Sequence, residues 1–138
     1  SGYKMKSSQE IFALLSDVYG VSPWNLEQIE ADLKQADTEY FYLYDDQTLI
    51  GFLALQDLAG ELEITQLAVK KANQGQGLAN RLMGFLADRP ERIFLEVRAS
   101  NQVAKALYEK HGFQPVGQRK NYYQNPVEDA ILMAREGK

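Results

Sequence analysis

A glycine-rich turn between a strand pattern and a helical pattern constrains the fold of this chain more than any other stretch. The turn is residues 74–79, Gln-Gly-Gln-Gly-Leu-Ala, between an apolar run at 64–69 and a helical pattern at 78–87. This order predicts a strand, a tight turn and a helix. Glycines allow the backbone to turn sharply and a ligand to approach closely. The first N–H groups of the helix have no partner inside it, so they favour an anion such as phosphate.

The turn alone does not identify its ligand. The dinucleotide-binding fingerprint requires a third glycine or an alanine where Asn80 stands, and the Gly-Lys-Ser/Thr of nucleotide hydrolases is missing. A glycine-rich connection without any ligand remains an alternative at this point.

Length and composition describe an ordinary globular protein. The chain has 138 residues, of which 45% are hydrophobic and 25% charged, which is enough for one domain with a core over residues 1–138. No apolar run approaches the ~20 residues that span a bilayer, and no secretory signal is visible. We therefore expect a cytoplasmic protein that does not bind membranes.

Cysteine content and charge exclude several function classes. The chain has no cysteine and one histidine, which excludes disulfides, thiolate catalysis and cysteine- or histidine-rich metal sites, so we expect no metal. The net charge of −4 argues against broad nucleic-acid binding and is compatible with a basic peptide as partner.

Hydrophobic periodicity predicts two helices at the start of the chain. The first has Ser7 as its N-cap, with Glu10 completing a capping box, and ends at Gly20. The second begins near Asn25, which forms a cap pair with Gln28.

The rest of the chain predicts a mixed sheet. Strand patterns cover residues 39–44, 48–56, 61–69, 92–97, 113–120 and 128–134, with turns at 45–47 and 57–60, and with helices at 78–87 and after Asn101. The element order is α, α, β, β, β, α, β, α, β, β. It indicates an α/β (α+β) domain whose central sheet is mostly antiparallel, with one parallel β-α-β unit and flanking helices.

Residues 95–101, Leu-Glu-Val-Arg-Ala-Ser-Asn, form the longest and most specific motif. It is followed by Leu107-Tyr108-Glu109, Gly112-Phe113, Asn121-Tyr122-Tyr123 and Glu128-Asp129-Ala130. With the Gln-x-x-Gly-x-Ala pattern of the glycine turn, these motifs resemble the GNAT superfamily of acetyltransferases. More narrowly, they are similar to the bacterial ribosomal-protein-alanine N-acetyltransferases. The resemblance covers about residues 23–133. The family's first strand is shortened or missing here, which would expose a sheet edge.

The resemblance implies acetyl-CoA as co-substrate, bound by the turn and by two further segments. In the family the strand before the turn pairs with the pantetheine arm, and the turn binds the pyrophosphate. Asn101 has a helix N-cap as its alternative role, and both roles can hold. The implied cofactor-binding residues are Leu67, Ala68, Val69, Gln74, Gly75, Gln76, Gly77, Leu78, Ala79, Asn80 and Asn101.

Glu96 is the candidate general base. Within its strand it points opposite to Leu95 and Val97, and an apolar setting could raise its pKa toward neutrality. A solvated strand glutamate is the alternative, and the family's base falls at this position. Glu63 and Glu61 on the preceding strand are rivals, and Glu63 could relay a proton through water.

Tyr108 is the candidate general acid, because a phenol near the leaving sulfur can donate its proton. A packing tyrosine is the alternative. The resemblance places the acceptor site near the segment before the last strand, with Trp24 either lining it or packing in the core. The implied acceptor-binding residues are Trp24, Arg119, Asn121, Tyr122 and Tyr123.

The expected function is direct acetyl transfer from acetyl-CoA to a protein N-terminal α-amino group. By resemblance, the acceptor is ribosomal protein S18 beginning with alanine. Two alternatives remain. One is a GNAT enzyme acting on another amine, such as a lysine, a polyamine or another peptide. The other is a non-catalytic module that binds acetyl-CoA or a protein partner.

Overall fold

The computed structural model describes residues 2–138, with side chains from Ser7 onward, and the chain divides into two compact units. Unit 1 holds the chain up to Gln56 together with Thr65–Leu86, and unit 2 holds Asp57–Ile64 together with Ala87–Lys138. Strand β3 (Glu61–Val69) contributes to both units. Hydrogen bonding orders the strands β1-β2-β3-β4-β6-β5, so β1 and β5 are the edge strands.

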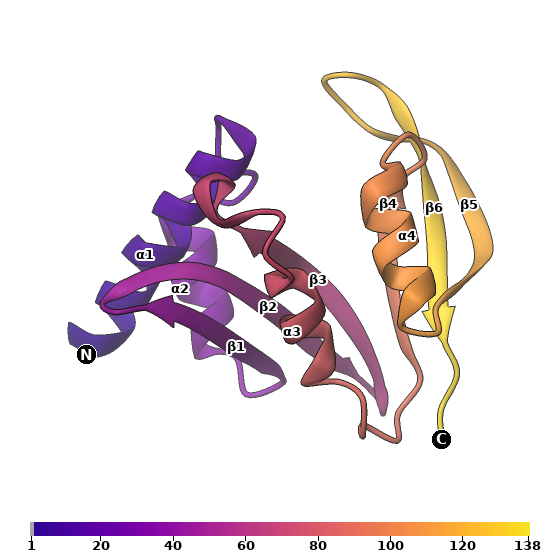
Figure 1. Ribbon diagram of the computed structural model, residues 1–138, viewed down its shortest axis with the longest axis horizontal. Helices are drawn as coiled ribbons and strands as arrows, with labels where there is room; N and C mark the ends of the chain where they lie inside the picture. Colours follow the sequence, from indigo (N-terminus) through magenta and orange to yellow (C-terminus); the bar gives the residue numbers. More distant parts are fainter. Residues whose placement is uncertain (1) are drawn as a thin grey trace. The chain divides into compact units, whose positions relative to one another are not determined.

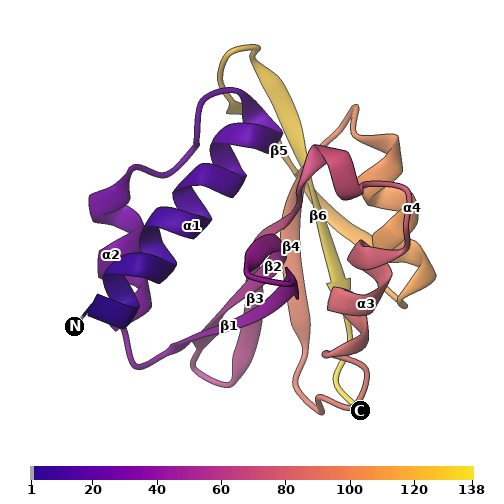
Figure 2. The same ribbon diagram turned by 60° about the vertical axis from the view of Figure 1, so that its left-hand side comes forward.

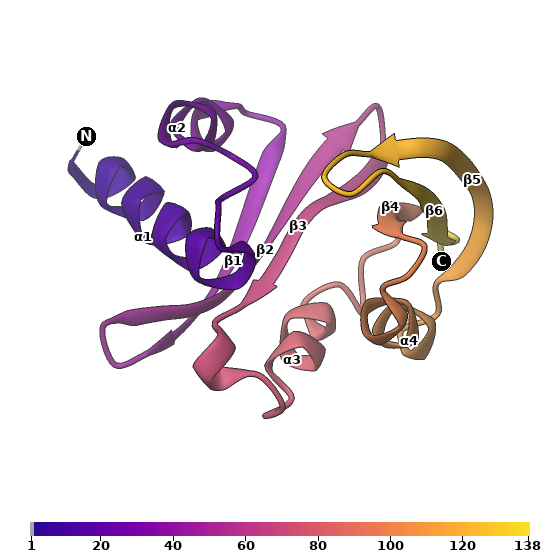
Figure 3. The ribbon, with the colours of Figure 1, turned by 90° about the horizontal axis from the view of Figure 1, so that it is seen from above.

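Unit 1 is a helix-covered antiparallel hairpin. Figures 2 and 3 show α1 and α2 side by side on one face of the unit's strands and α3 on the other. Buried side chains of α1, α2 and β2 form its core, among them Ile11, Leu15, Ile29 and Phe52. The elements are α1 (Gly2–Tyr19), α2 (Leu26–Lys34), β1 (Thr38–Asp45), β2 (Thr48–Leu58), η1 (Lys71–Asn73) and α3 (Leu78–Gly84).

The predicted start of the first helix is wrong. Helix α1 begins at Gly2, so Ser7 lies inside it and not at its N-cap. Ser7 and Ser8 are buried, and Ser8 Oγ donates to Glu30 Oε1 of α2 at 3.4 Å. A small hydroxyl side chain suits a close helix–helix contact as well as a cap, and the local sequence does not distinguish the two uses.

The other helix boundaries follow the sequence more closely. Gly20 ends α1 at φ +78°, and its N–H donates to Ser16 O at 2.8 Å. The cap pair of Asn25 and Gln28 is confirmed by two reciprocal hydrogen bonds of 2.8 Å. Helix α3 is shorter than predicted. It ends at Gly84, because the next turn tightens to bonds between residues three apart.

Unit 2 is a four-stranded arrangement with one helix. The start of β3 pairs in parallel with β4 (Ile93–Arg98), and β6 (Glu128–Arg135) lies antiparallel between β4 and β5 (Gln114–Tyr123). Figures 1 and 3 show α4 (Gln102–Lys110) alongside β4 and β6. The mixed sheet with one parallel pair is therefore confirmed.

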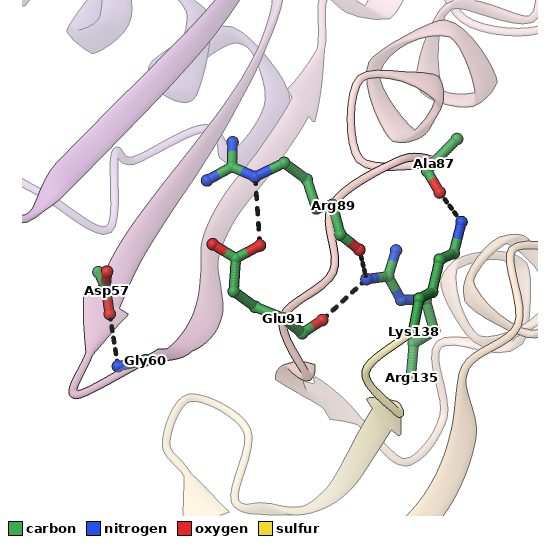
Figure 4. A network of polar contacts seen from close by, with 7 residues as sticks. All are labelled: Asp57, Gly60, Ala87, Arg89, Glu91, Arg135 and Lys138. Carbon is green, nitrogen blue, oxygen red and sulfur yellow. Dashed lines mark hydrogen bonds and ion pairs between the residues drawn. The ribbon is translucent and has the colours of Figure 1, made fainter.

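Polar contacts tie the end of β6 to the loop before β4 (Figure 4). Arg135 Nη2 donates to the carbonyls of Arg89 and Glu91 at 2.6 and 2.8 Å, and Lys138 contacts the carbonyl of Ala87. The same view shows the 57–60 turn, where Gly60 N–H donates to the Asp57 carboxylate at 2.8 Å. None of the helices described here is long and apolar enough to cross a membrane.

Candidate active site

Burial alternates strictly along β4 and separates a buried apolar face from a partly exposed face that carries Glu96 and Arg98, here called the polar face. Ile93, Leu95 and Val97 are buried, whereas Phe94, Glu96 and Arg98 are only partly buried. Successive side chains of a strand point to opposite faces, so the two groups lie on opposite sides of the sheet. The predicted orientation of Glu96 relative to Leu95 and Val97 is therefore confirmed.

Glu96 is paired with Arg119 across β6. Arg119 Nε lies 2.6 Å from Glu96 Oε2, and the side chains are 60% and 14% exposed respectively. The strand register explains how they meet. Glu96 faces Leu132 on β6, while Arg119 on β5 faces Ala130, so the arginine reaches diagonally over a small residue.

Glu63 and Tyr122 complete a titratable cluster around this pair. Glu63 pairs with Phe94, two residues before Glu96, so both carboxylates lie on one face. Burial and the negative charge of Glu96 raise the pKa of Glu63, while Arg119 lowers it. Burial, the charge of Glu96 and a hydrogen bond to it raise the pKa of the Tyr122 phenol. Glu61, the other candidate for the base, forms an ion pair with Arg92 instead, with its Oε1 2.9 Å from Arg92 Nη1.

Arg98 fixes the turn between β5 and β6. Its guanidinium donates to the carbonyls of Gln124 and Pro126 at 2.9 and 3.0 Å, pairs with Glu128 at 3.2 Å, and lies 4.5 Å from the Tyr123 ring centroid. The sequence analysis predicts no role for Arg98 or Glu128. The sequence feature that could have indicated this anchoring role is that both residues belong to the specific motifs and lie at strand ends, where side chains can reach a neighbouring turn.

The carboxylates at the start of β6 complete this anchoring. Glu128 Oε2 accepts a hydrogen bond from Ser100 N–H at 2.7 Å, and the Ser100 and Arg98 contacts lower its pKa. Asp129 accepts from Asn121 N–H at 2.8 Å and from the Gln118 amide at 2.7 Å, and these bonds lower its pKa. Asn121, a predicted acceptor contact, thus shapes β5 through its backbone, at φ +53°.

The two tyrosines that follow Asn121 differ in environment. Their rings meet edge to face at 5.1 Å, but only Tyr122 is strongly exposed, at 48%. Arg119 lies 5.6 Å from the Tyr122 ring centroid. Arg119, Tyr122 and Glu96 are therefore brought together, and binding of an acceptor by this group stays a prediction.

Tyr108 and Asn101 belong to α4. Tyr108 is 8% exposed in the last turn, with its ring 5.8 Å from that of Phe113. Asn101 is the N-cap and accepts from Ala104 N–H at 3.1 Å, which confirms that alternative. The acid role of Tyr108 and the cofactor contact of Asn101 stay predictions.

The glycine turn of unit 1 has the conformation expected for a ligand loop. Gly75 and Gly77 have φ values of +81° and +78°, and a Cβ at either would meet open space. Gly77 is the N-cap of α3, and the first helical bond runs from Arg81 N–H to Gly77 O. The N–H groups of Leu78 and Ala79 precede that bond and have no acceptor inside the helix. This backbone fits a pyrophosphate, and binding of one by Gly75, Gly77, Leu78 and Ala79 stays a prediction.

The segments beside the turn are fixed within unit 1. Gln74 donates its amide to Val69 O at 3.0 Å, at the end of β3. Ala68 and Val69 are buried, and Gly51 allows Ala68 O to approach within 3.3 Å of where a Cβ would stand. Trp24 packs against the unit 1 core, which confirms its alternative role. Cofactor contact by Gln74, Gln76, Asn80, Leu67, Ala68 and Val69 stays a prediction.

Comparisons with known proteins identify the family. The sequence profile of the Acetyltransferase (GNAT) family matches residues 8–113. The chain is 34% identical over 123 residues to N-alpha-acetyltransferase RimI of Mycobacterium tuberculosis, covering 85% of this chain and 78% of the relative. It is 39% identical over 101 residues to the [ribosomal protein bS18]-alanine N-acetyltransferase of Escherichia coli K12, covering 68% of each.

A solved structure agrees with the sequence comparisons. The crystal structure of the ribosomal-protein-S18-alanine N-acetyltransferase from Escherichia coli superposes with a TM-score of 0.84 at 29% identity. The match covers 94% of this chain and 87% of that one. The profile match spans most of the chain and the two relatives exceed 30% identity, so the chain belongs to the GNAT family of N-acetyltransferases.

Proposed function

We propose that this chain acetylates the N-terminal α-amino group of ribosomal protein S18, at an N-terminal alanine, in the bacterial cytoplasm. The observation that carries the proposal is the largely buried carboxylate of Glu96, on the polar face of unit 2, in a chain similar to the Escherichia coli protein whose name states that activity. We further propose that residues 1–138 act as one acetyltransferase domain.

Acetyl-CoA supplies the acetyl group, and unit 1 supplies the groups that fit its pyrophosphate. The positive φ values of Gly75 and Gly77 turn the backbone so that the first N–H groups of α3 are available. Side-chain atoms at either glycine would occupy the space that a phosphate needs. The buried end of β3 at Ala68 and Val69 is the proposed edge for the pantetheine arm.

The proposed reaction needs one base and one acid. Glu96 removes a proton from the acceptor ammonium, and the neutral amine nitrogen forms a bond to the acetyl carbon. The C–S bond of the thioester breaks when the tetrahedral intermediate collapses. Tyr108 gives its phenolic proton to the departing thiolate and is reprotonated from the amide nitrogen's second proton through solvent. The products are an N-acetyl peptide and CoA thiol, with one proton left on Glu96.

The test is release of CoA thiol from acetyl-CoA with a short peptide that begins with alanine. We expect Glu96→Gln and Tyr108→Phe to lower kcat/KM by about 10²-fold or more, as for loss of a general base or acid. A Tyr40→Phe variant is the matched control for Tyr108→Phe, since it removes a phenol hydroxyl from unit 1, where Tyr40 contacts Asp32. Circular dichroism and acetyl-CoA binding confirm that each variant is folded.

Two results would contradict the proposal. If the wild type binds acetyl-CoA but acetylates no peptide or other amine, a binding module is the better account. If it acetylates polyamines or lysine better than the alanine peptide, the GNAT chemistry stands and the acceptor is wrong.

A further inference from the structure

The ion pair between Arg119 and Glu96 differs from two other arginine–glutamate pairs of unit 2. In those two pairs, Arg92 with Glu61 and Arg98 with Glu128, the arginine side chains are about one-third exposed, at 33% and 32%. Arg119 is 60% exposed, whereas Glu96 is only 14% exposed. An exposed guanidinium exchanges its partner for water readily, whereas a largely buried carboxylate needs a partner.

The contact between Arg119 and Glu96 is one of charge more than of hydrogen bonding. Glu96 Oε2 is shielded from solvent and receives no aligned hydrogen bond from the residues described here, although Arg119 Nε is 2.6 Å away. Buried carboxylate oxygens normally accept at least one hydrogen bond. A donor from outside the chain would therefore gain a well-formed bond to Oε2 once the guanidinium moves away.

The charges around Glu96 favour the binding of a cationic ligand. The groups facing it are Glu63 on β3, Arg119 and Tyr122 on β5, the uncharged Leu132 on β6, and Arg98 on its own strand. Arg98 is occupied by the turn carbonyls and Glu128. That leaves two carboxylates, Glu63 and Glu96, beside one exposed cation, Arg119.

We propose that Arg119 is an exchangeable counter-ion of Glu96, which the protonated amine of the acceptor displaces. This inference rests on the proposed function, because that amine is the group Glu96 deprotonates. When the acceptor arrives, its ammonium takes the place of the guanidinium on Oε2 and transfers one proton to the carboxylate. Arg119 is thus a positioning residue that selects cationic primary amines.

The test compares Arg119→Gln with Lys120→Gln. Both variants remove one positive charge from adjacent positions of β5, but Lys120 is exposed and its charge lowers the pKa of Asp129. KM and kcat are measured separately for the alanine peptide. Arg119→Lys tests rescue by a conservative variant.

For Arg119→Gln we expect KM for the peptide to fall about threefold, because the ammonium no longer competes with a resident cation. The value of kcat should stay close to that of the wild type, because Glu96 itself is unchanged. Arg119→Lys should restore most of the wild-type KM. Lys120→Gln should leave KM within about twofold of the wild type, as for an exposed charge.

A second readout does not need turnover. In wild-type protein with CoA in place of acetyl-CoA, the Arg119 Nε–H resonance should move toward the position of solvent-exposed arginines when the peptide is added. Arg119→Gln identifies the resonance. A rise in KM of tenfold or more for Arg119→Gln, or an unchanged resonance at saturating peptide, would overturn the proposal while leaving the acetyltransferase function intact. Absence of peptide acetylation by the wild type would instead overturn the proposed function.

Discussion

Two arginine–glutamate pairs on the same side of unit 2 have similar chemistry and different surroundings. Arg98 and Glu128 are 3.2 Å apart, and both take further partners, with turn carbonyls around the arginine and Ser100 N–H on the glutamate. Arg119 and Glu96 are closer, at 2.6 Å, but their charges lack aligned hydrogen bonds at Oε2. The first pair is built to hold a turn in place, and the second is built to change partners. Judged by the N···O distance alone, the Arg119–Glu96 pair would be taken as the more firmly held of the two.

The largest expected difference between the two pairs comes from neutralising the glutamate of each pair. Glu96→Gln should lower kcat/KM by about 10²-fold or more, because the proposed base is lost, with little change in the free energy of unfolding. Glu128→Gln should lower the free energy of unfolding and leave kcat within about threefold of the wild type, because the turn loosens while the proposed base remains. Urea unfolding and thiol-release kinetics of both variants separate the roles. Equal effects of the two variants on both quantities would contradict the distinction.

Removing the anchoring arginine should affect stability first. Arg98→Met loses hydrogen bonds to two carbonyls and a carboxylate, so we expect the free energy of unfolding to fall by about 1–2 kcal/mol, since these charged bonds are partly exposed. Arg98→Lys should fall between Met and the wild type, because an ammonium cannot reach both carbonyls as a guanidinium does. Thermal or urea unfolding measures the difference. A wild-type stability for Arg98→Met would show that the turn does not depend on this anchor.

Glu63, which lies beside Glu96, should make the free energy of unfolding depend on pH. Its pKa is raised in the folded protein by burial and by Glu96. The folded state therefore holds this proton more tightly than the unfolded chain does, and the resulting stability is present at low pH and lost as pH rises through the raised pKa. Glu63→Gln should thus stabilise the protein at pH 7, and the gain should vanish below about pH 4.

Glu61→Gln is the control for this pH effect. Glu61 lies on the same strand but is half exposed and paired with Arg92, so we expect a small loss of stability near neutral pH and no gain. A Glu63→Gln variant that is less stable than the wild type at pH 7 would mean that the folded protein favours the ionised form of Glu63, contrary to this prediction.

Much of the fold was readable from the sequence because local signals agreed with the tertiary structure. The alternation that placed Glu96 opposite Leu95 and Val97, the cap at Asn25 and the end of α1 at Gly20 all depend on near neighbours. Ser7 was misassigned because a buried helix contact and a cap use the same residue type. The boundary of α3 shifted because its last turn tightens, which periodicity does not record.

The candidate site was readable only in part, because its contacts join distant strands. The sequence indicated Glu96 as the base and Arg119 as a neighbour of the acceptor, but not that the two side chains meet. That contact depends on the register of β4, β6 and β5 and on the small Ala130 between them. The anchoring role of Arg98 likewise appears only when the turn carbonyls of Gln124 and Pro126 are placed beside it.

The most direct test of the central claim is to locate the acetyl group by mass spectrometry. The substrate is a peptide with an N-terminal alanine and one internal lysine, incubated with acetyl-CoA and either the wild type or Glu96→Gln. We expect the wild type to acetylate the α-amino group and to leave the lysine unmodified, and we expect Glu96→Gln to give less product by about 10²-fold or more. Acetylation of the lysine, or equal product from both proteins, would contradict it.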